Sequence, residues 1–285
     1  MKQFKIEWTD VRDGLSPLLR YALMQLKKMN DDNYGKFRNS KRVVEIVTRD
    51  FKVNPEILYD ALINLTYPRC KVELIDGHGN VGFPPADMYF TEMRVSNFYR
   101  QIIDEHNTDF DTPLYIPLPL VFINGTSNYK TVVPSHNVGE VIDATIALIK
   151  DPTLETKDLL KCIKGPDLLV GGEIINKDDL CKIYEKGYGE IKIKVTPETL
   201  NYRWFDDAVD YCDWYELEIE ENENEQIISI PYNALLFDGK STKHMSLKEI
   251  LQCHLANYNN SLTLEEICEK LENLKQLTKE RLTKC

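Results

Sequence analysis

The chain has 285 residues, of which 42% are hydrophobic and 28% charged, as in a globular protein, and no apolar run approaches the roughly 20 residues that cross a bilayer. The seven cysteines form no CxxC pair, which argues against a structural zinc site and favours reduced thiols. The net charge of −11 falls entirely after residue 110, because residues 1 to 110 hold 16 basic and 16 acidic side chains.

Three short helices are predicted in the first 67 residues. Residues 14 to 30 and 40 to 50 carry apolar side chains at helical spacing, and residues 54 to 67 begin with an Asn N-cap followed by Pro. Eight basic side chains against four acidic ones lie between residues 27 and 52, around the second helix. This pattern fits a helix-turn-helix or winged-helix module that binds DNA, and it also fits a plain three-helix bundle with a solvated basic surface.

The rest of the chain mixes helices and strands. A glycine loop at residues 76 to 82 leads into a predicted helix over 90 to 106, and the proline-rich stretch 112 to 122 suits neither a helix nor a central strand. Another helix is predicted over 136 to 151. Strands are predicted at 172 to 176, 189 to 196, 214 to 221 and 225 to 232, followed by helices at 246 to 260 and 263 to 285. The predicted fold class is therefore α+β, with a domain boundary near residues 150 to 155.

Six segments, in this order, resemble the A subunit of bacterial type IIA topoisomerases, the family of DNA gyrase and topoisomerase IV. They read DVRDGLSPLLR (10 to 20), NSKRVVEIV (39 to 47), LIDGHGNVG (74 to 82), MYFTEMRVS (88 to 96), VPSHNVGEVIDA (133 to 144) and GPDLLVGG (165 to 172). The resemblance implies a winged-helix, DNA-gate-like domain over 1 to 152, a tower-like domain over 153 to 255 and a C-terminal helix over 256 to 285. Because the chain ends there, we expect it to lack the long coiled coil and exit gate of full-length A subunits.

The family cleaves DNA with a tyrosine whose hydroxyl attacks a phosphodiester, and its motif reads Arg-Tyr-Thr-Glu. The corresponding residues here are Tyr89-Phe90-Thr91-Glu92. Phe90 thus takes the position of the nucleophile without a hydroxyl, and Tyr89 replaces the supporting arginine. Adjacent side chains diverge by about 100° on a helix, so we expect Tyr89 not to reach the attacking geometry. The alternative is an active subunit in which Tyr89 is the nucleophile.

The resemblance also assigns DNA contacts. Arg20 matches a catalytic arginine of the family, and without a nucleophile it is expected to contact phosphate or to be a surface arginine. Val133 matches the isoleucine that the family wedges into DNA, with a loop or core valine as the alternative. His136, beside it, is expected to be a hydrogen-bonded structural histidine. The basic helix region that would neutralise phosphates comprises Lys36, Arg38, Ser40, Lys41 and Arg42.

Two departures from the family pattern accompany the missing tyrosine. Its His-Pro-His-Gly-Asp loop is replaced by residues 52 to 56, which read KVNPE, and the turn before VPSHN is shortened to NYKTVV. We therefore expect a catalytically defective A-subunit paralogue that binds duplex DNA as a homodimer in the bacterial cytoplasm, associated with the nucleoid and not with a membrane.

Two other functions fit the sequence. One is a working topoisomerase subunit, which would obtain magnesium and ATP only through a separate B-type subunit, since no cofactor or metal site is expected in this chain. The other is a regulator that pairs with genuine gyrase or topoisomerase IV subunits, with an acidic second half that repels DNA or mimics its charge.

Overall fold

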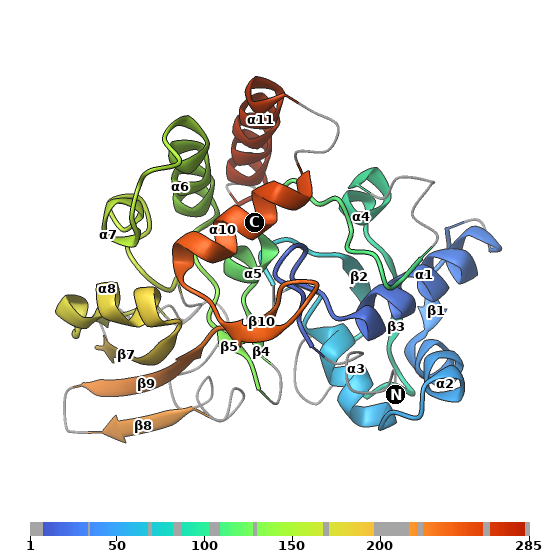
Figure 1. Ribbon diagram of the computed structural model, residues 1–285. Helices are drawn as coiled ribbons and strands as arrows, with labels where there is room; N and C mark the ends of the chain where they lie inside the picture. Colours follow the sequence, from blue (N-terminus) through green and yellow to red (C-terminus); the bar gives the residue numbers. More distant parts are fainter. Residues whose placement is uncertain are drawn as a thin grey trace. The chain divides into compact units, whose positions relative to one another are not determined.

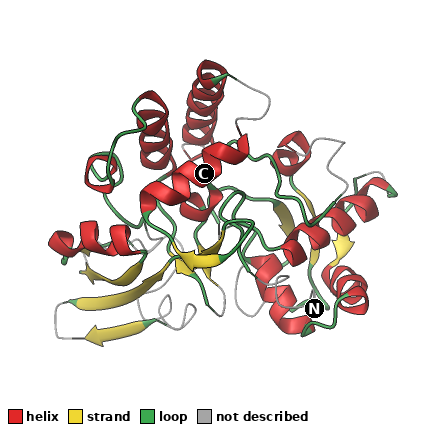
Figure 2. Cartoon of the chain, in the orientation of Figure 1, coloured by secondary structure: helices red, strands yellow, loops and turns green. Residues whose placement is uncertain are grey.

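The computed structural model describes residues 8–33, 35–67, 70–81, 87–102, 109–127, 130–167, 171–196, 217–221, 225–258 and 263–282. Some residues of the predicted segments lie outside these ranges, namely residues 82, 103–106, 168–170, 214–216, 259–260 and 283–285. Helices and strands are mixed along the chain, which confirms the α+β class (Figure 2). Within the described ranges, none of the helices combines the length and the apolar character needed to cross a membrane. The contacts divide the chain into two compact units, Met1–Asn124 and Gly125–Cys285.

The first unit contains the three predicted helices and a small sheet (Figure 1). Its elements are α1 (Pro17–Asp31), β1 (Arg38–Asn39), α2 (Ser40–Asp50), α3 (Pro55–Ile63), β2 (Ile75–His78), β3 (Glu92–Val95), α4 (Asn97–Ile102) and α5 (Leu120–Ile123). The side chain of Ser16 accepts a hydrogen bond from the amide of Leu19 and so caps α1. Asn54 caps α3 in the same way, as predicted. The apolar stripes of the helices form the core, with the fully buried side chains Ala22, Leu23, Leu26, Val43, Val47 and Leu62.

The sheet of this unit is antiparallel, with the strand order β1-β3-β2. Its central strand β3 lies where a helix over residues 90 to 106 was predicted, so that prediction is wrong for residues 92 to 95. Met93 and Val95 are buried, whereas Glu92 and Arg94 are half exposed, which is the alternation of a strand. Glu92 stands opposite His78 of β2 and is hydrogen-bonded to it, and Arg94 stands opposite Asp76 and forms an ion pair with it. The helical part begins only with α4.

The second unit is a six-stranded sheet with helices around it. Its elements are β4 (Thr126–Ser127), β5 (Val132–Val133), α6 (Val138–Lys150), α7 (Thr156–Leu159), β6 (Glu173–Ile174), α8 (Lys177–Lys186), β7 (Tyr188–Val195), β8 (Glu218–Glu221), β9 (Gln226–Asn233), β10 (Leu235–Phe237), β11 (Thr242–His244), α10 (Leu247–Tyr258) and α11 (Leu264–Leu282). β7 and β9 pair along their whole length. β5 and β8 pair with opposite ends of β9, and β10 and β11 form a separate hairpin. The strands predicted at 189 to 196 and 225 to 232 are confirmed.

Helix α6 belongs to the second unit, although the sequence predicted a boundary after it, near residue 152. The reason is the apolar face of α6, which packs on α7, α10 and α11 of the same unit, and α6 and α11 lie side by side in Figure 1. Lys275 of α11 and Asp143 of α6 form an ion pair across this contact. The contacts therefore place the division at Asn124, in the loop after α5.

Candidate nucleic-acid interface

The residues that precede β3 form a turn that is bonded to the start of α2. We call residues 87 to 91 the aromatic turn. The amide of Tyr89 donates to Oδ1 of Asp87 at 2.7 Å, and the amide of Phe90 donates to the carbonyl oxygen of Asp87 at 3.1 Å. The amide of Lys41, in the first turn of α2, donates to the carbonyl oxygen of Met88 at 3.0 Å. The aromatic turn therefore satisfies backbone donors that a helix leaves open at its N-terminus.

Three hydroxyl groups from three elements meet beneath the aromatic turn. Oγ1 of Thr91 lies 2.9 Å from Oγ of Ser40 in α2 and 2.7 Å from the hydroxyl oxygen of Tyr59 in α3. It also lies 3.0 Å from the carbonyl oxygen of Asp87. The amide of Ser40 donates to the carbonyl oxygen of Thr91 at 2.9 Å. Burial raises the pKa of Tyr59, so its hydroxyl stays protonated in this cluster.

Ser40 is therefore a structural residue. It is fully buried, and its hydroxyl and its amide both bond to Thr91. The structure contradicts the predicted DNA contact by Ser40, because the side chain faces the core and its hydrogen bonds hold the aromatic turn on α2. The prediction depended on a serine at the start of a helix. Such a serine hydrogen-bonds to the local backbone as readily as it contacts a ligand.

Two aromatic side chains project from the aromatic turn. The side chain of Phe90 is 83% exposed and that of Tyr89 is 58% exposed. The ammonium group of Lys41 lies 4.3 Å from the centroid of the Tyr89 ring, within the range of a cation–π contact, and 3.6 Å from a carboxylate oxygen of Glu45. The side-chain amide of Asn39 donates to the carbonyl oxygen of Tyr89 at 3.1 Å. The Tyr89 ring is thus held against α2, while the Phe90 ring is open to solvent.

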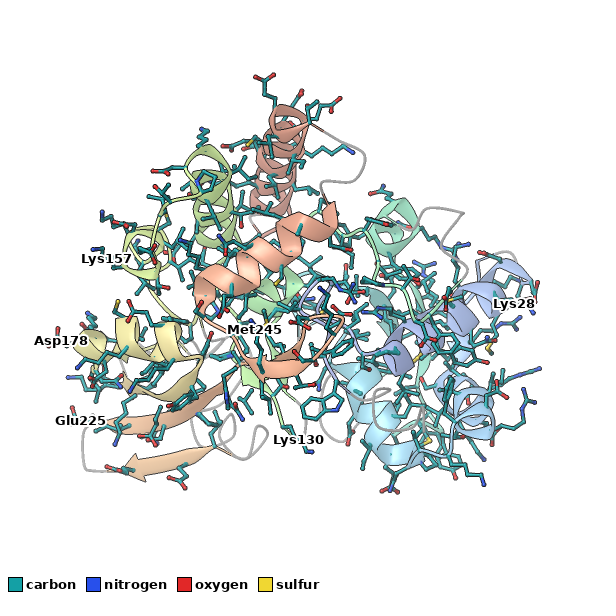
Figure 3. All side chains as sticks on the ribbon, in the orientation of Figure 1. Lys28, Lys130, Lys157, Asp178, Glu225 and Met245 are labelled. Atoms are coloured by element: carbon teal, nitrogen blue, oxygen red, sulfur yellow. The ribbon has the colours of Figure 1, made fainter. Side chains whose placement is uncertain are left out.

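Basic side chains of the predicted set flank this turn. Lys36 and Arg42 are exposed, and the side chain of neither makes a hydrogen bond or an ion pair with another residue in the described part of the chain. Arg38 is half buried, and its Nε donates to the carbonyl oxygen of Met29 at 2.9 Å. Arg42 also lines an open hollow on α2 together with Glu45, Ile46 and Arg49. Lys28, labelled in Figure 3, adds an exposed cation at the end of α1.

Arg20 is fully buried, so it is neither a surface arginine nor a phosphate contact, and both predictions for it are wrong. Its Nε and Nη2 lie 2.6 and 2.9 Å from the two carboxylate oxygens of Asp13, and Nη2 is 3.1 Å from Oδ2 of Asp10. Burial alone lowers the pKa of Arg20, but the charges and hydrogen bonds of Asp13 and Asp10 together outweigh it, and the net shift is upward. The guanidinium group is therefore charged and sealed between two carboxylates.

The sequence did not point to Asp13 as a site residue. In the structure its carboxylate connects distant parts of the first unit. Besides binding Arg20, its carboxylate accepts hydrogen bonds from the amides of Leu15 at 3.1 Å and Leu114 at 2.8 Å. Nη1 of Arg20 donates to the carbonyl oxygen of Phe110 at 3.3 Å. The segment around residues 10 to 20 is thus fastened to the stretch 110 to 114, which has no regular secondary structure of its own.

The two candidates in the second unit are both core residues. Val133 is 1% exposed and pairs with Thr126 of β4, so the structure contradicts a wedge at this position and supports the core alternative. An apolar wedge has to project from the surface before it can enter a base step. His136 is fully buried, and its Nε2 lies 2.6 Å from the hydroxyl oxygen of Tyr184, which confirms a hydrogen-bonded structural histidine.

Comparison with known proteins identifies relatives for the larger part of the chain. The sequence profile that describes the A subunits of DNA gyrase and topoisomerase IV matches residues 9–203. The A subunit of DNA topoisomerase 4 from Neisseria gonorrhoeae is 35% identical over 213 residues, which are 66% of this chain and 28% of that protein. The A subunit of DNA gyrase from Thermotoga maritima is 33% identical over 208 residues, which are 65% of this chain and 26% of that protein. The chain therefore spans only about a quarter of the length of these relatives.

Proposed function

Because the chain belongs to the family of DNA gyrase and topoisomerase IV A subunits, we propose that it binds duplex DNA through its N-terminal unit and lacks the nucleophile for cleaving it. The observation that carries the proposal is the aromatic turn, where the exposed residue at the nucleophile position is Phe90. A phenyl ring has no oxygen with which to form a phosphoester. The exposed cations Lys36 and Arg42 supply the charge for phosphate contacts.

The contents of the first unit support a winged-helix assignment. α1, α2 and α3 occur with the sheet β1-β3-β2, and a helix with a basic N-terminal half is the element that such modules place in the major groove. In this proposal α2 is that helix, and the aromatic turn lies at the end that faces the DNA. The hairpin of β2 and β3 takes the place of the wing. The three-helix-bundle alternative lacks this sheet, which favours the winged helix.

The contacts of Tyr89 argue against the alternative of an active subunit. Its ring is held by Lys41, and its backbone is fixed by Asp87 and Asn39, so the phenol is directed by a bonded turn. A misplacement of about 1 Å can reduce a reaction rate around a hundredfold. Arg20 is sealed in the core and is unable to stabilise charge on a phosphate. The geometry thus favours a DNA-binding role without transesterification.

The remaining features of the proposal follow from the family. Residues 153–255 would form the tower-like part, whose described strands β7 and β9 lie at its centre. The protein would act as a homodimer in the cytoplasm, on the nucleoid, and would use magnesium and ATP only if a B-type subunit supplied them. The second candidate stays a regulator that pairs with genuine gyrase or topoisomerase IV subunits. If the protein does not bind DNA, the exposed ring of Phe90 favours this role, because it could contact a protein partner.

Titration of labelled duplex DNA at several salt concentrations tests the proposal. The wild-type protein should bind with little sequence preference and weaken steeply as salt rises, because phosphate contacts release counterions. The double variant Lys41→Glu/Arg42→Glu should bind more weakly. Its plot of log K against the logarithm of the salt concentration should be less steep, by about 2 in the magnitude of the slope. The matched control is Lys150→Glu/Lys157→Glu, which makes the same charge change at two exposed lysines of the second unit. Equal behaviour of the two double variants would refute the assigned interface.

A further inference from the structure

Phe90 combines an exposed side chain with a hydrogen-bonded backbone. Among the described residues it is the most exposed of the large hydrophobic side chains, at 83%. Single exposed apolar side chains are common, and exposure alone carries no function. Here the backbone is bonded on both sides, at Asp87 and through Thr91 to Ser40, so the ring is presented to solvent by a braced turn. Because the backbone beneath the ring is already ordered, covering the ring with a flat partner has only the side-chain torsions of Phe90 to order.

The charges around the ring suit a nucleic-acid partner. Lys41 is held on the Tyr89 ring, next to Phe90 in sequence, and the side chain of Arg42 follows it without a partner in the described chain. The acidic neighbours also have partners, since Asp87 accepts the Tyr89 amide, Glu45 lies 3.6 Å from the Lys41 ammonium group and Glu92 is hydrogen-bonded to His78 at 3.1 Å. Aromatic rings beside cations are the usual elements of surfaces that stack bases and contact the adjoining phosphates.

Resting on the proposed function, we infer that Phe90 stacks on an unpaired base and that this protein prefers DNA with a gap over intact duplex. In an intact duplex both faces of each base are covered by its neighbours, so a phenyl ring finds free faces at gaps, ends and unstacked steps. One face of the Tyr89 ring is covered by Lys41, which leaves Phe90 as the stacking ring and makes Tyr89 a positioning residue. The same turn position that carries the nucleophile in the family thus carries a base contact here.

The test compares two labelled DNAs that differ only in a short single-stranded gap, at one salt concentration. Wild-type protein should bind the gapped DNA more tightly. Phe90→Ala should weaken gapped-DNA binding by about 5- to 150-fold, the range for loss of one stacked base, and should weaken intact-duplex binding much less. Phe90→Leu should lose most of the preference, because leucine keeps apolar area but has no π face. Phe90→Trp should keep it.

A second readout reports stacking directly. A fluorescent base analogue in the gap should be quenched by wild-type protein and by Phe90→Trp, and not by Phe90→Ala. The control is Ile57→Ala on α3, since Ile57 is also apolar and 69% exposed but lies outside the aromatic turn. Equal affinity of the wild type for both DNAs, or equal effects of Phe90→Ala and Ile57→Ala, would overturn the inference and leave duplex binding standing. Absence of all DNA binding would instead sink the proposed function.

Discussion

The hydroxyl of Thr91 lies 2.9 Å from the hydroxyl of Ser40, and this contact joins the aromatic turn to the first residue of α2. Tyr59 of α3 completes the cluster at 2.7 Å. The exposed aromatic pair is therefore held in place by buried polar groups, whose partners lie about 30 to 50 residues away in sequence. Polar clusters of this kind stabilise a fold only while every member keeps its partners.

Thr91→Val should destabilise the first unit. Valine keeps the shape of threonine but leaves the buried hydroxyls of Ser40 and Tyr59 without this partner, which costs about 1–3 kcal/mol of unfolding free energy. Urea denaturation measures the change. Thr48→Val is the control, because within the described part of the chain the hydroxyl of Thr48 bonds only to carbonyl oxygens of its own helix near the surface. Its loss should cost within about 0.5 kcal/mol. Equal costs for the two variants would count against the cluster.

Arg20→Met should lower the free energy of unfolding more than Thr91→Val does. The substitution leaves the carboxylate of Asp13 buried without its cation, while Asp10 keeps Arg12, and breaking a buried pair in this way costs about 3–5 kcal/mol. The control is Arg12→Met, because Arg12 binds Asp10 from a position that is 27% exposed and should cost less. If Arg20→Met were as stable as wild type and failed only in DNA binding, Arg20 would be a ligand contact after all.

No covalent protein–DNA adduct should form. Labelled plasmid is incubated with the wild-type protein, magnesium, ATP and a B subunit from the same cell, and the reaction is stopped with a denaturant that preserves phosphotyrosine. We expect no adduct with the wild type or with Tyr89→Phe, because Phe90 lacks a hydroxyl and the Tyr89 ring is held by Lys41. An adduct that appears with the wild type and disappears with Tyr89→Phe would establish that Tyr89 is the nucleophile of an active enzyme.

Gly187→Ala should be far more damaging than Gly35→Ala. Both glycines have positive φ angles, 76° and 73°, in the left-handed region. A Cβ at Gly187, which ends α8, would stand 2.5 Å from the carbonyl oxygen of Met245, whereas one at Gly35 would meet nothing within 4 Å. Gly35→Ala should therefore cost only the backbone strain of about 1–2 kcal/mol, and Gly187→Ala clearly more. Thermal unfolding of the two variants compares them directly.

Stability should fall at high pH partly through Tyr21. Burial and the hydrogen bond to Asp50, at 2.5 Å, raise the pKa of Tyr21 to about 12 from an ordinary value of 10.0. The folded state thus favours the neutral phenol, and this contribution is complete below pH 10 and is lost as pH rises toward 12. Tyr21→Phe should show a smaller loss of unfolding free energy between pH 9 and pH 12 than wild type. Parallel pH curves would contradict the role of this bond.

Local patterns predicted most of the helices and the two long strands. Apolar spacing and the Asn54 cap located α1, α2 and α3, because one face of each helix is buried and the signal lies within a single segment. The strand β3 was predicted as part of a helix. It has only four residues, and its identity depends on pairing with β1 and β2, which are distant in sequence.

Burial of individual site residues was the part that the sequence did not reveal. Ser40 was predicted to contact DNA, Arg20 to contact phosphate or lie on the surface, and Val133 to be a DNA wedge or a loop or core valine. All three lie in the core. The type of each residue was compatible with a surface role, and only the partners Asp13, Thr91 and Thr126 show otherwise. Phe90 was the reverse case, since a phenylalanine is usually buried and here the turn exposes it.

The sealed arrangement of Arg20 between Asp10 and Asp13 has a consequence for how activity is judged from motifs. Loss of Arg20 leaves the carboxylate of Asp13 unpaired in the core, so Arg20 and Asp13 are expected to change together or not at all. A descendant that stops cleaving DNA would keep both residues for the sake of its fold. The arginine in such a motif therefore reports ancestry, and the exposed position at the aromatic turn is the one to inspect for chemistry.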